Sequence, residues 1–220
     1  MAEQPVTFPT AGPAAGITLE GLFSAPPQGT TAPGVVICHP HPLYGGSMQN
    51  NVVSALTLAI ADLGFAVLRF NFRGAGRSQG QHAKGEGEAF DAEGAIGWLS
   101  EQPGIDSSRL GLAGYSFGAS VSVTVTGRDP RVRAAAFIAL PSQLLPDRRD
   151  LDGCITPKFF ISGEQDSVSD TAGLEHYVGR LAEPKRLQMA PGVDHFWQGS
   201  EGVMSAAVAT FFRETLGAGS

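Results

Sequence analysis

Short, wholly apolar segments alternate with longer amphipathic segments along most of the chain. Residues 34–38 (Gly-Val-Val-Ile-Cys) have no polar position, which is typical of a strand buried on both faces of a sheet. From Val52 to Leu63, apolar residues recur at every third or fourth position, which predicts an amphipathic helix that ends at Gly64. The same reasoning predicts strands at residues 17–23, 65–70, 109–113, 133–140, 158–161 and 185–189, and helices at residues 89–99, 116–126, 172–181 and 199–212.

This alternation of strands and helices predicts an α/β fold with a mostly parallel central sheet flanked by helices on both faces. The early strand at residues 17–23 is expected to pair with residues 6–8. There is no internal repeat, charge run or long linker, so we expect residues 1–220 to form a single domain. The connection at residues 141–157 is too short to hold a cap or lid domain.

Composition and charge exclude several classes of protein. The 29 glycines and 15 prolines are many, but a hydrophobic fraction of 42% supplies a core, so we expect an ordered chain. A net charge of -6 without a basic run argues against a nucleic-acid partner or a membrane surface. No apolar run approaches the ~20 residues that span a bilayer, and the N-terminus lacks a signal-peptide pattern. Cys38 and Cys154 are too few for a disulfide scaffold, so we expect a cytoplasmic protein with reduced thiols.

Two pentapeptides, residues 114–118 and 76–80, fit the pattern Gly-x-Ser-x-Gly. The first follows a predicted strand and begins a predicted helix, which is the strand–turn–helix setting of a nucleophilic serine. There the helix N-terminus adds partial positive charge, and the N–H of Phe117 can point at an oxyanion. The second leads into a polar, non-periodic stretch, so we expect Ser78 to lie in a structural loop. Ser116 is therefore the predicted nucleophile.

A serine nucleophile needs a general base, and five histidines are available. His195 follows the last predicted strand, and ligand chemistry in parallel sheets gathers beyond the carboxyl ends of the strands. We therefore expect His195 on the same edge of the sheet as Ser116. His176 falls inside a predicted helix and His82 in a polar loop, so we expect both at the surface.

The general base in turn needs a carboxylate that orients its ring and stabilises the imidazolium. Asp166 lies just beyond another predicted strand and therefore on the same edge of the sheet. Glu164 and Asp170 are alternatives close by in the sequence. We expect Asp166 to be the acid that pairs with His195.

The order Ser116, Asp166, His195 is that of the α/β-hydrolase scaffold, and the chain resembles this superfamily from about Ile17 to its C-terminus. It resembles a branch of small, lidless serine hydrolases similar to dienelactone hydrolases and carboxylesterases. The resemblance implies the α/β-hydrolase fold without a cap or lid domain. Dienelactone hydrolases typically have a cysteine where this chain has Ser116, so their reaction is not implied. The segments that carry the resemblance are residues 39–48, 69–78, 114–118, 163–166 and 194–195.

The loop that supplies the second oxyanion donor begins His39-Pro-His-Pro-Leu43. Proline has no N–H, so the second donor, beside Phe117, must come from His41 or Leu43, with Tyr44 as a third choice. Two imidazoles in this loop also suggest zinc, but no further ligands at tetrahedral spacing accompany them. We expect no metal and no cofactor, and a buried His39 that packs or hydrogen-bonds beside the loop.

The sequence also suggests which side chains surround the substrate. We expect an apolar and aromatic pocket near the nucleophile. Its candidate residues are Tyr44, Met48, Phe117, Leu144, Leu145, Phe196 and Trp197.

Together these features predict a serine hydrolase, carboxylesterase-like, that cleaves small carboxylic esters through an acyl-enzyme intermediate. A small-molecule acyl ester is the expected substrate, and the oligomeric state is left open. A thioesterase, a lactone hydrolase or a peptidase could use the same three residues. A non-catalytic binding protein with this fold is the alternative from another class.

Overall fold

The apolar runs of the sequence form the strands of one sheet. The computed structural model describes residues 3–14, 16–142 and 148–217. Within them the strands join in the order β1-β2-β4-β3-β5-β6-β7-β8. Their bounds are β1 Gln4–Pro9, β2 Thr18–Ser24, β3 Ala32–Cys38, β4 Ala66–Phe70, β5 Ile105–Tyr115, β6 Val132–Ile138, β7 Lys158–Gly163 and β8 Lys185–Ala190.

The direction of the strands decides where a site can form. β2 runs antiparallel to both of its neighbours, β1 and β4. All other neighbouring pairs, from β4·β3 to β7·β8, are parallel. The carboxyl ends of β3 to β8 therefore share one edge of the sheet, and the loops after these strands meet there.

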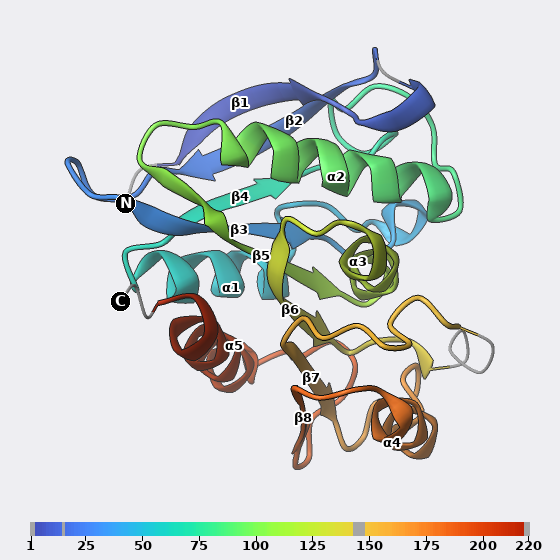
Figure 1. The fold of residues 1–220 in the computed structure, drawn as a ribbon. Coiled ribbons are helices and arrows are strands. Elements are labelled where there is room, and N and C mark those ends of the chain that lie inside the picture. Colours follow the sequence, from blue (N-terminus) through green and yellow to red (C-terminus); the bar gives the residue numbers. More distant parts are fainter. Residues whose placement is uncertain (1–2, 15, 143–147, 218–220) are drawn as a thin grey trace.

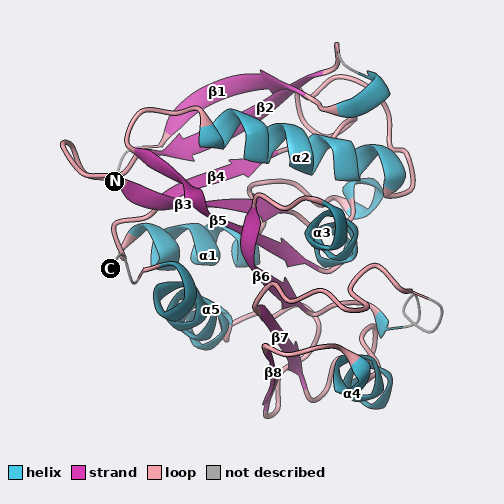
Figure 2. Cartoon of the chain, viewed as in Figure 1, coloured by secondary structure: helices cyan, strands magenta, loops and turns pink. Residues whose placement is uncertain are grey.

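Helices cover both faces of the sheet, as the alternating pattern predicts (Figures 1 and 2). α1 and α5 supply apolar side chains to the core on one face, and α2, α3 and α4 supply them to the core on the other. None of the described helices is both long and apolar enough to cross a lipid bilayer. The bounds are α1 Asn51–Ala61, α2 Glu86–Ser100, α3 Phe117–Arg128, α4 Thr171–Arg180 and α5 Glu201–Leu216.

The structure confirms the predicted fold class, and the differences lie at the ends of elements and in two short helices. The strand expected at residues 133–140 ends at Ile138, because Ala139 has a positive φ of 47° that takes the chain out of the sheet. Two short 3₁₀ helices, η1 (Gly12–Ala14) and η2 (Pro42–Tyr44), were not predicted. The described part of the connection between β6 and β7 forms no cap over the carboxyl edge.

A buried ion pair ties the loop after β4 to α2. The Arg73 guanidinium donates from Nε and Nη2 to the two carboxylate oxygens of Asp91, at 3.0 and 2.8 Å. The backbone N–H of Arg73 donates to Asp91 as well, at 3.0 Å. The side chain of Asp91 is completely buried and that of Arg73 is 7% exposed. Removing either partner would leave a buried charge without compensation.

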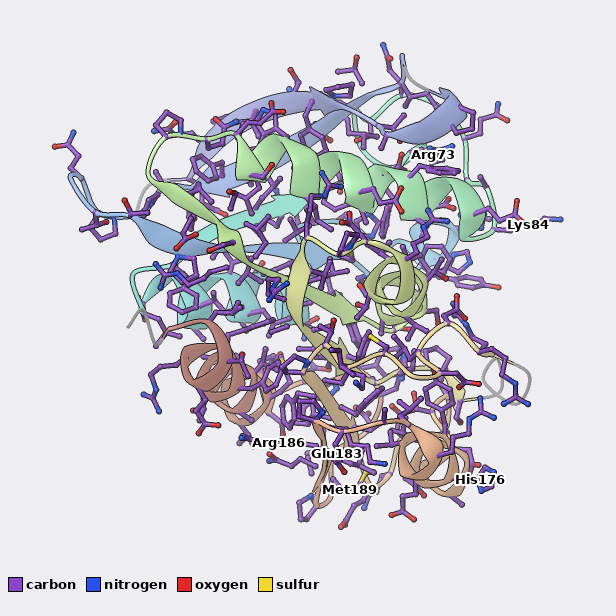
Figure 3. All side chains as sticks on the ribbon, viewed as in Figure 1. Arg73, Lys84, His176, Glu183, Arg186 and Met189 are labelled. Carbon is purple, nitrogen blue, oxygen red and sulfur yellow. The ribbon has the colours of Figure 1, made fainter. Side chains whose placement is uncertain are left out.

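We therefore expect Asp91→Ala to lower the free energy of unfolding by about 3–5 kcal/mol, measured by urea denaturation. The matched control is Arg186→Ala, which breaks the exposed pair of Arg186 and Glu214 and should change stability by about 1 kcal/mol or less. Figure 3 shows Arg73 beside α2 and Arg186 at the opposite end of the molecule. If Asp91→Ala stayed as stable as Arg186→Ala, the pair would not hold α2 in place.

Candidate active site

Ser116 occupies the tight turn between β5 and α3. Its backbone has φ 55° and ψ −116°, a conformation that non-glycine residues rarely adopt. The turn is possible because two glycines let the backbone pass closely. A Cβ on Gly114 would lie 2.3 Å from the carbonyl oxygen of Gly118, and a Cβ on Gly118 would lie 2.3 Å from that of Cys38. The spacing of the pentapeptide thus follows from contact between backbones.

Three side chains from separate loops form one hydrogen-bonded chain at the carboxyl edge. The Ser116 Oγ lies 2.9 Å from His195 Nε2. His195 Nδ1 lies 2.9 Å from Oδ2 and 3.0 Å from Oδ1 of Asp166. Because Nδ1 faces a carboxylate it carries the proton, which leaves Nε2 free to accept from the Ser116 hydroxyl. The structure thus brings together the three residues expected to do the chemistry.

Asp166 is held as a carboxylate by its surroundings. Its Oδ1 accepts the backbone N–H groups of Val168 and Ser169, at 2.8 and 2.7 Å. Burial raises the pKa of Asp166, but the hydrogen bonds from His195, Ser169 and Val168 outweigh it and bring the pKa below its usual value. Asp166 therefore stays ionised at neutral pH, as a partner for an imidazolium requires.

The two alternative carboxylates lie elsewhere. Glu164 is exposed to solvent. Asp170 caps α4, where its Oδ2 accepts the backbone N–H of Gly173 at 2.8 Å. Of the three carboxylates considered from the sequence, the structure brings Asp166 alone to His195.

The loop that carries His195 is fixed by two contacts that the sequence analysis missed. The hydroxyl of Tyr115 donates to the backbone carbonyl of His195 at 2.9 Å. The Asn51 side chain donates to the carbonyl of Phe196 at 3.3 Å and to Glu201 at 2.7 Å. Tyr115 stands directly before the nucleophile, so its position in the pentapeptide was the available signal. Burial raises the pKa of Tyr115, and the hydroxyl remains a donor.

The loop after β3 narrows the choice of the second oxyanion donor. The backbone N–H of Leu43 donates to Nδ1 of His41 at 3.2 Å, and that of Tyr44 to the carbonyl of His41 at 3.1 Å. The N–H groups of Leu43 and Tyr44 are therefore already engaged in the turn of η2. This argues against the expectation that either residue supplies the second oxyanion donor. In the described part of the chain, no acceptor engages the N–H of His41 or that of Phe117, the first residue of α3.

His39, the first residue of this loop, is completely buried. Its Nδ1 donates to the carbonyl of Pro40 at 2.6 Å, and its Nε2 accepts the N–H of Phe72 at 3.0 Å. Burial lowers the pKa of His39 to about 4. Both ring nitrogens are therefore engaged in a neutral imidazole. In the described ranges, no group of three or more histidine, cysteine and acidic side chains is arranged to hold a metal ion.

A cavity of about 510 Å³ opens beside Ser116. Tyr44 and Phe196 line it and are 88% and 63% exposed. A second cavity of the same volume shares Phe117 and Ser120 with it but contains none of the three hydrogen-bonded residues. The described residues that line the first cavity are Pro40, His41, Tyr44, Gly45, Gly46, Asn50, Tyr115, Ser116, Phe117, Ser120, Pro141, Val168, His195 and Phe196.

Two residues expected in the pocket are corrected. Trp197 has a positive φ of 60° and is completely buried in the core cluster to which α1 and α5 contribute, so it does not line the cavity. Met48 is 6% exposed and does not line the cavity, and its backbone is bound to Asn71 and Arg69. Leu144 and Leu145 lie outside the described residues.

The remaining serine and histidine candidates have other surroundings. The hydroxyl of Ser78 donates to the carbonyl of Asn71 at 2.6 Å and accepts the N–H of Glu20 at 3.0 Å. Ser78 therefore braces a loop. His176 is exposed on α4, as expected. The expectation of a solvated His82 is corrected, because its side chain is only 13% exposed.

The chain is similar to several known proteins. Residues 16–177 match the family described as X-Pro dipeptidyl-peptidase (S15 family). An uncharacterized protein of Rickettsia prowazekii is 34% identical over 187 residues, which cover 82% of this chain and 78% of the relative.

Two solved structures extend the likeness over nearly the whole chain. One, from Xanthomonas campestris, is described as an α/β serine hydrolase without a lid (28% identity, 100% of this chain and 98% of that chain, TM-score 0.83). A putative α/β-hydrolase of unknown function from Agrobacterium tumefaciens is 32% identical over 97% of each chain, with a TM-score of 0.85. These matches confirm the predicted α/β-hydrolase fold.

The buried, neutral His39 predicts a pH dependence of stability. In the unfolded chain its imidazole takes up a proton below pH ~6.5, but in the folded protein only below about 4. Between these values the unfolded state binds more protons, so lowering the pH destabilises the fold, by up to about 3 kcal/mol at pH 4. In urea denaturation from pH 7 to 4.5, the stability of His39→Gln should fall less steeply than that of the wild type.

The control is His176→Gln, which removes an exposed histidine and should keep the wild-type slope. An unchanged slope in His39→Gln would contradict the assignment of this pH dependence to His39.

Proposed function

Because this chain belongs to the X-Pro dipeptidyl-peptidase (S15) family and has the α/β-hydrolase fold, we propose that it is a serine hydrolase that cleaves carboxylic esters. The observation that carries the proposal is the hydrogen-bonded chain from Ser116 through His195 to Asp166. Ser116 and His195 line a cavity that is open to solvent, so a small acyl substrate can reach the serine hydroxyl.

In the first half of the reaction, Ser116 Oγ attacks the acyl carbonyl while His195 Nε2 takes its proton. The ionised Asp166 stabilises the imidazolium that forms. The N–H groups of Phe117 and His41 hold the oxyanion of the tetrahedral intermediate. Each such donor is typically worth roughly 3–4 kcal/mol of transition-state stabilisation. His195 then gives its proton to the departing alcohol, and the acyl group stays on Ser116.

In the second half, His195 activates a water molecule that attacks the acyl-enzyme through the same oxyanion hole. The collapse of this second intermediate returns the proton from His195 to Ser116 and releases the carboxylic acid. No other titratable residue is required, which is consistent with the isolation of Glu164 and Asp170 from the site.

The cavity favours uncharged, partly apolar substrates. Among the described residues that line it there is no aspartate, glutamate, lysine or arginine. Tyr44 and Phe196 instead expose aromatic rings at its edge. A charged substrate group would lose hydration there without gaining a partner, so neutral acyl groups should bind better. Thioesters and lactones satisfy the same requirement and remain alternatives within this reaction class.

The family match favours a second candidate, an X-Pro dipeptidyl-peptidase that uses the same three residues. A dipeptidyl-peptidase must recognise the free α-ammonium group of its substrate. A buried ammonium needs a carboxylate or several carbonyl acceptors. The described lining offers no carboxylate, which is why we favour the ester.

We also propose the cytoplasmic location expected from the sequence. The proposal is supported by the cysteine content of the chain, because two cysteines are too few for a disulfide scaffold.

The proposed roles predict the kinetics of two variants on p-nitrophenyl butyrate. Ser116→Ala should lower kcat to near the background rate, a loss of about 10⁵-fold or more, because no other nucleophile is in place. Asp166→Asn should lower kcat by about 10³- to 10⁴-fold, because the amide cannot stabilise the imidazolium.

Glu164→Gln is the matched control for Asp166→Asn, since it removes a nearby but exposed carboxylate. It should retain wild-type kcat. If Ser116→Ala kept appreciable turnover, the proposed nucleophile would be wrong. If the wild type showed no turnover of any acyl substrate, the non-catalytic alternative would be favoured.

Two proline p-nitroanilides, one with a free and one with an acetylated amino terminus, distinguish an ester hydrolase from a dipeptidyl-peptidase. We expect p-nitrophenyl butyrate to be hydrolysed, and Ala-Pro-p-nitroanilide to have no advantage over its N-acetylated form, because the described lining has no partner for an ammonium group. The measurement is kcat/KM for each of the three substrates. A preference of more than about tenfold for the free amine would establish the peptidase in place of the ester hydrolase.

A further inference from the structure

Three rings from separate segments meet beside the nucleophile. They belong to His41 in the loop after β3, to Phe117 at the start of α3, and to His82 in the loop before α2. The ring centroids of His41 and Phe117 are 4.7 Å apart. That of His82 lies 4.7 Å from His41 and 5.4 Å from Phe117. Among the described rings, His82 alone contacts both of the others.

The ring of His82 also contacts Glu88, whose side chain is completely buried. His82 Nδ1 lies 2.9 Å from Glu88 Oε1, although the geometry of the contact is not that of a hydrogen bond. The same carboxylate accepts the N–H groups of Ala83 and Gly85, both at 2.8 Å. Glu88 therefore fixes the loop from residue 82 to residue 85 and, with it, the position of the ring.

The packing of His82 matters because His41 and Phe117 are the two proposed oxyanion donors. In the proposed mechanism the N–H groups of His41 and Phe117 form the oxyanion hole. They belong to different segments, and an oxyanion hole works only if both donors lie within about 3 Å of the oxyanion. The described backbone hydrogen bonds include none between His41 and Phe117 themselves. Their separation depends on the backbone contact of Gly118 with Cys38 and His39 and on the packing of side chains from the two segments.

We propose that His82 is a positioning residue of the oxyanion hole. Its ring, anchored at Glu88, packs against the rings of His41 and Phe117 and keeps their N–H groups at the spacing that the tetrahedral intermediate requires. This inference rests on the proposed function, since it assigns His82 a part in stabilising that intermediate. His82 touches neither substrate nor Ser116 in this role, and acts through the two donors.

Three substitutions at residue 82 distinguish the contribution of the ring from that of the contact with Glu88. His82→Ala removes both, His82→Gln keeps a polar group for Glu88 without a ring, and His82→Phe keeps a ring without the nitrogen. The control is His176→Ala on the outer side of α4 (Figure 3). Each protein is assayed on p-nitrophenyl butyrate, or on whichever acyl substrate the wild type turns over, and thermal melting checks that it is folded.

We expect His82→Ala and His82→Gln to lose about 10- to 100-fold in kcat, less than the loss of a whole donor. KM should stay within about threefold, because the substrate's ground state does not use the oxyanion hole. The inhibition constant of a matched trifluoromethyl ketone, whose adduct with Ser116 places an oxyanion in the hole, should rise by a similar factor. His82→Phe should recover kcat to within about fivefold of the wild type, and His176→Ala should be unchanged.

The proposal is overturned if folded His82→Ala keeps at least half of the wild-type kcat, if KM alone changes, or if the inhibition constant stays constant while kcat falls. It is also overturned if His82→Phe is as impaired as His82→Ala. Should His82→Ala not fold, His82→Gln carries the same criteria. A wild type without any acyl turnover would instead refute the proposed function, so the two failures are distinguishable.

Discussion

The contact between the backbone of Gly118 and the carbonyl of Cys38 is the constraint on which the site depends. Because of this contact, the first turn of α3 packs against the end of β3. Ser116 and the loop that begins at His39 therefore lie side by side at the same edge of the sheet. The strained backbone of Ser116 is tolerated because the strand before it and the helix after it are both held by the core. The nucleophile and the oxyanion loop are thus brought together by one packing contact.

The two sides of Ser116 are electrostatically different. On one side the ionised Asp166 prepares His195 to accept a proton and to carry a positive charge. On the other, burial lowers the pKa of both His39 and His41, so these rings stay neutral at pH 7. The ring of His41 accepts the N–H of Leu43 within the oxyanion loop, and the ring of His39 accepts the N–H of Phe72 from the loop after β4. The loop can therefore offer its remaining N–H groups to developing negative charge.

The sequence predicted what depends on local pattern and on strand direction. Ser116, Asp166 and His195 could be grouped because loops after parallel strands share an edge. It did not predict what depends on a single dihedral angle or a distant contact. Trp197 has a positive φ and is buried in the core, Leu43 donates its N–H to the ring of His41, and His82 contacts the buried Glu88. None of these has a periodic signal.

The central claim is that Ser116 is an activated nucleophile. The most direct measurement is labelling of the folded protein with a fluorophosphonate probe, followed by mass spectrometry of the modified peptides. We expect a single adduct on Ser116, none on Ser78, whose hydroxyl is engaged within its loop, and no adduct in Ser116→Ala. The absence of labelling, or an adduct on another serine, would contradict the account.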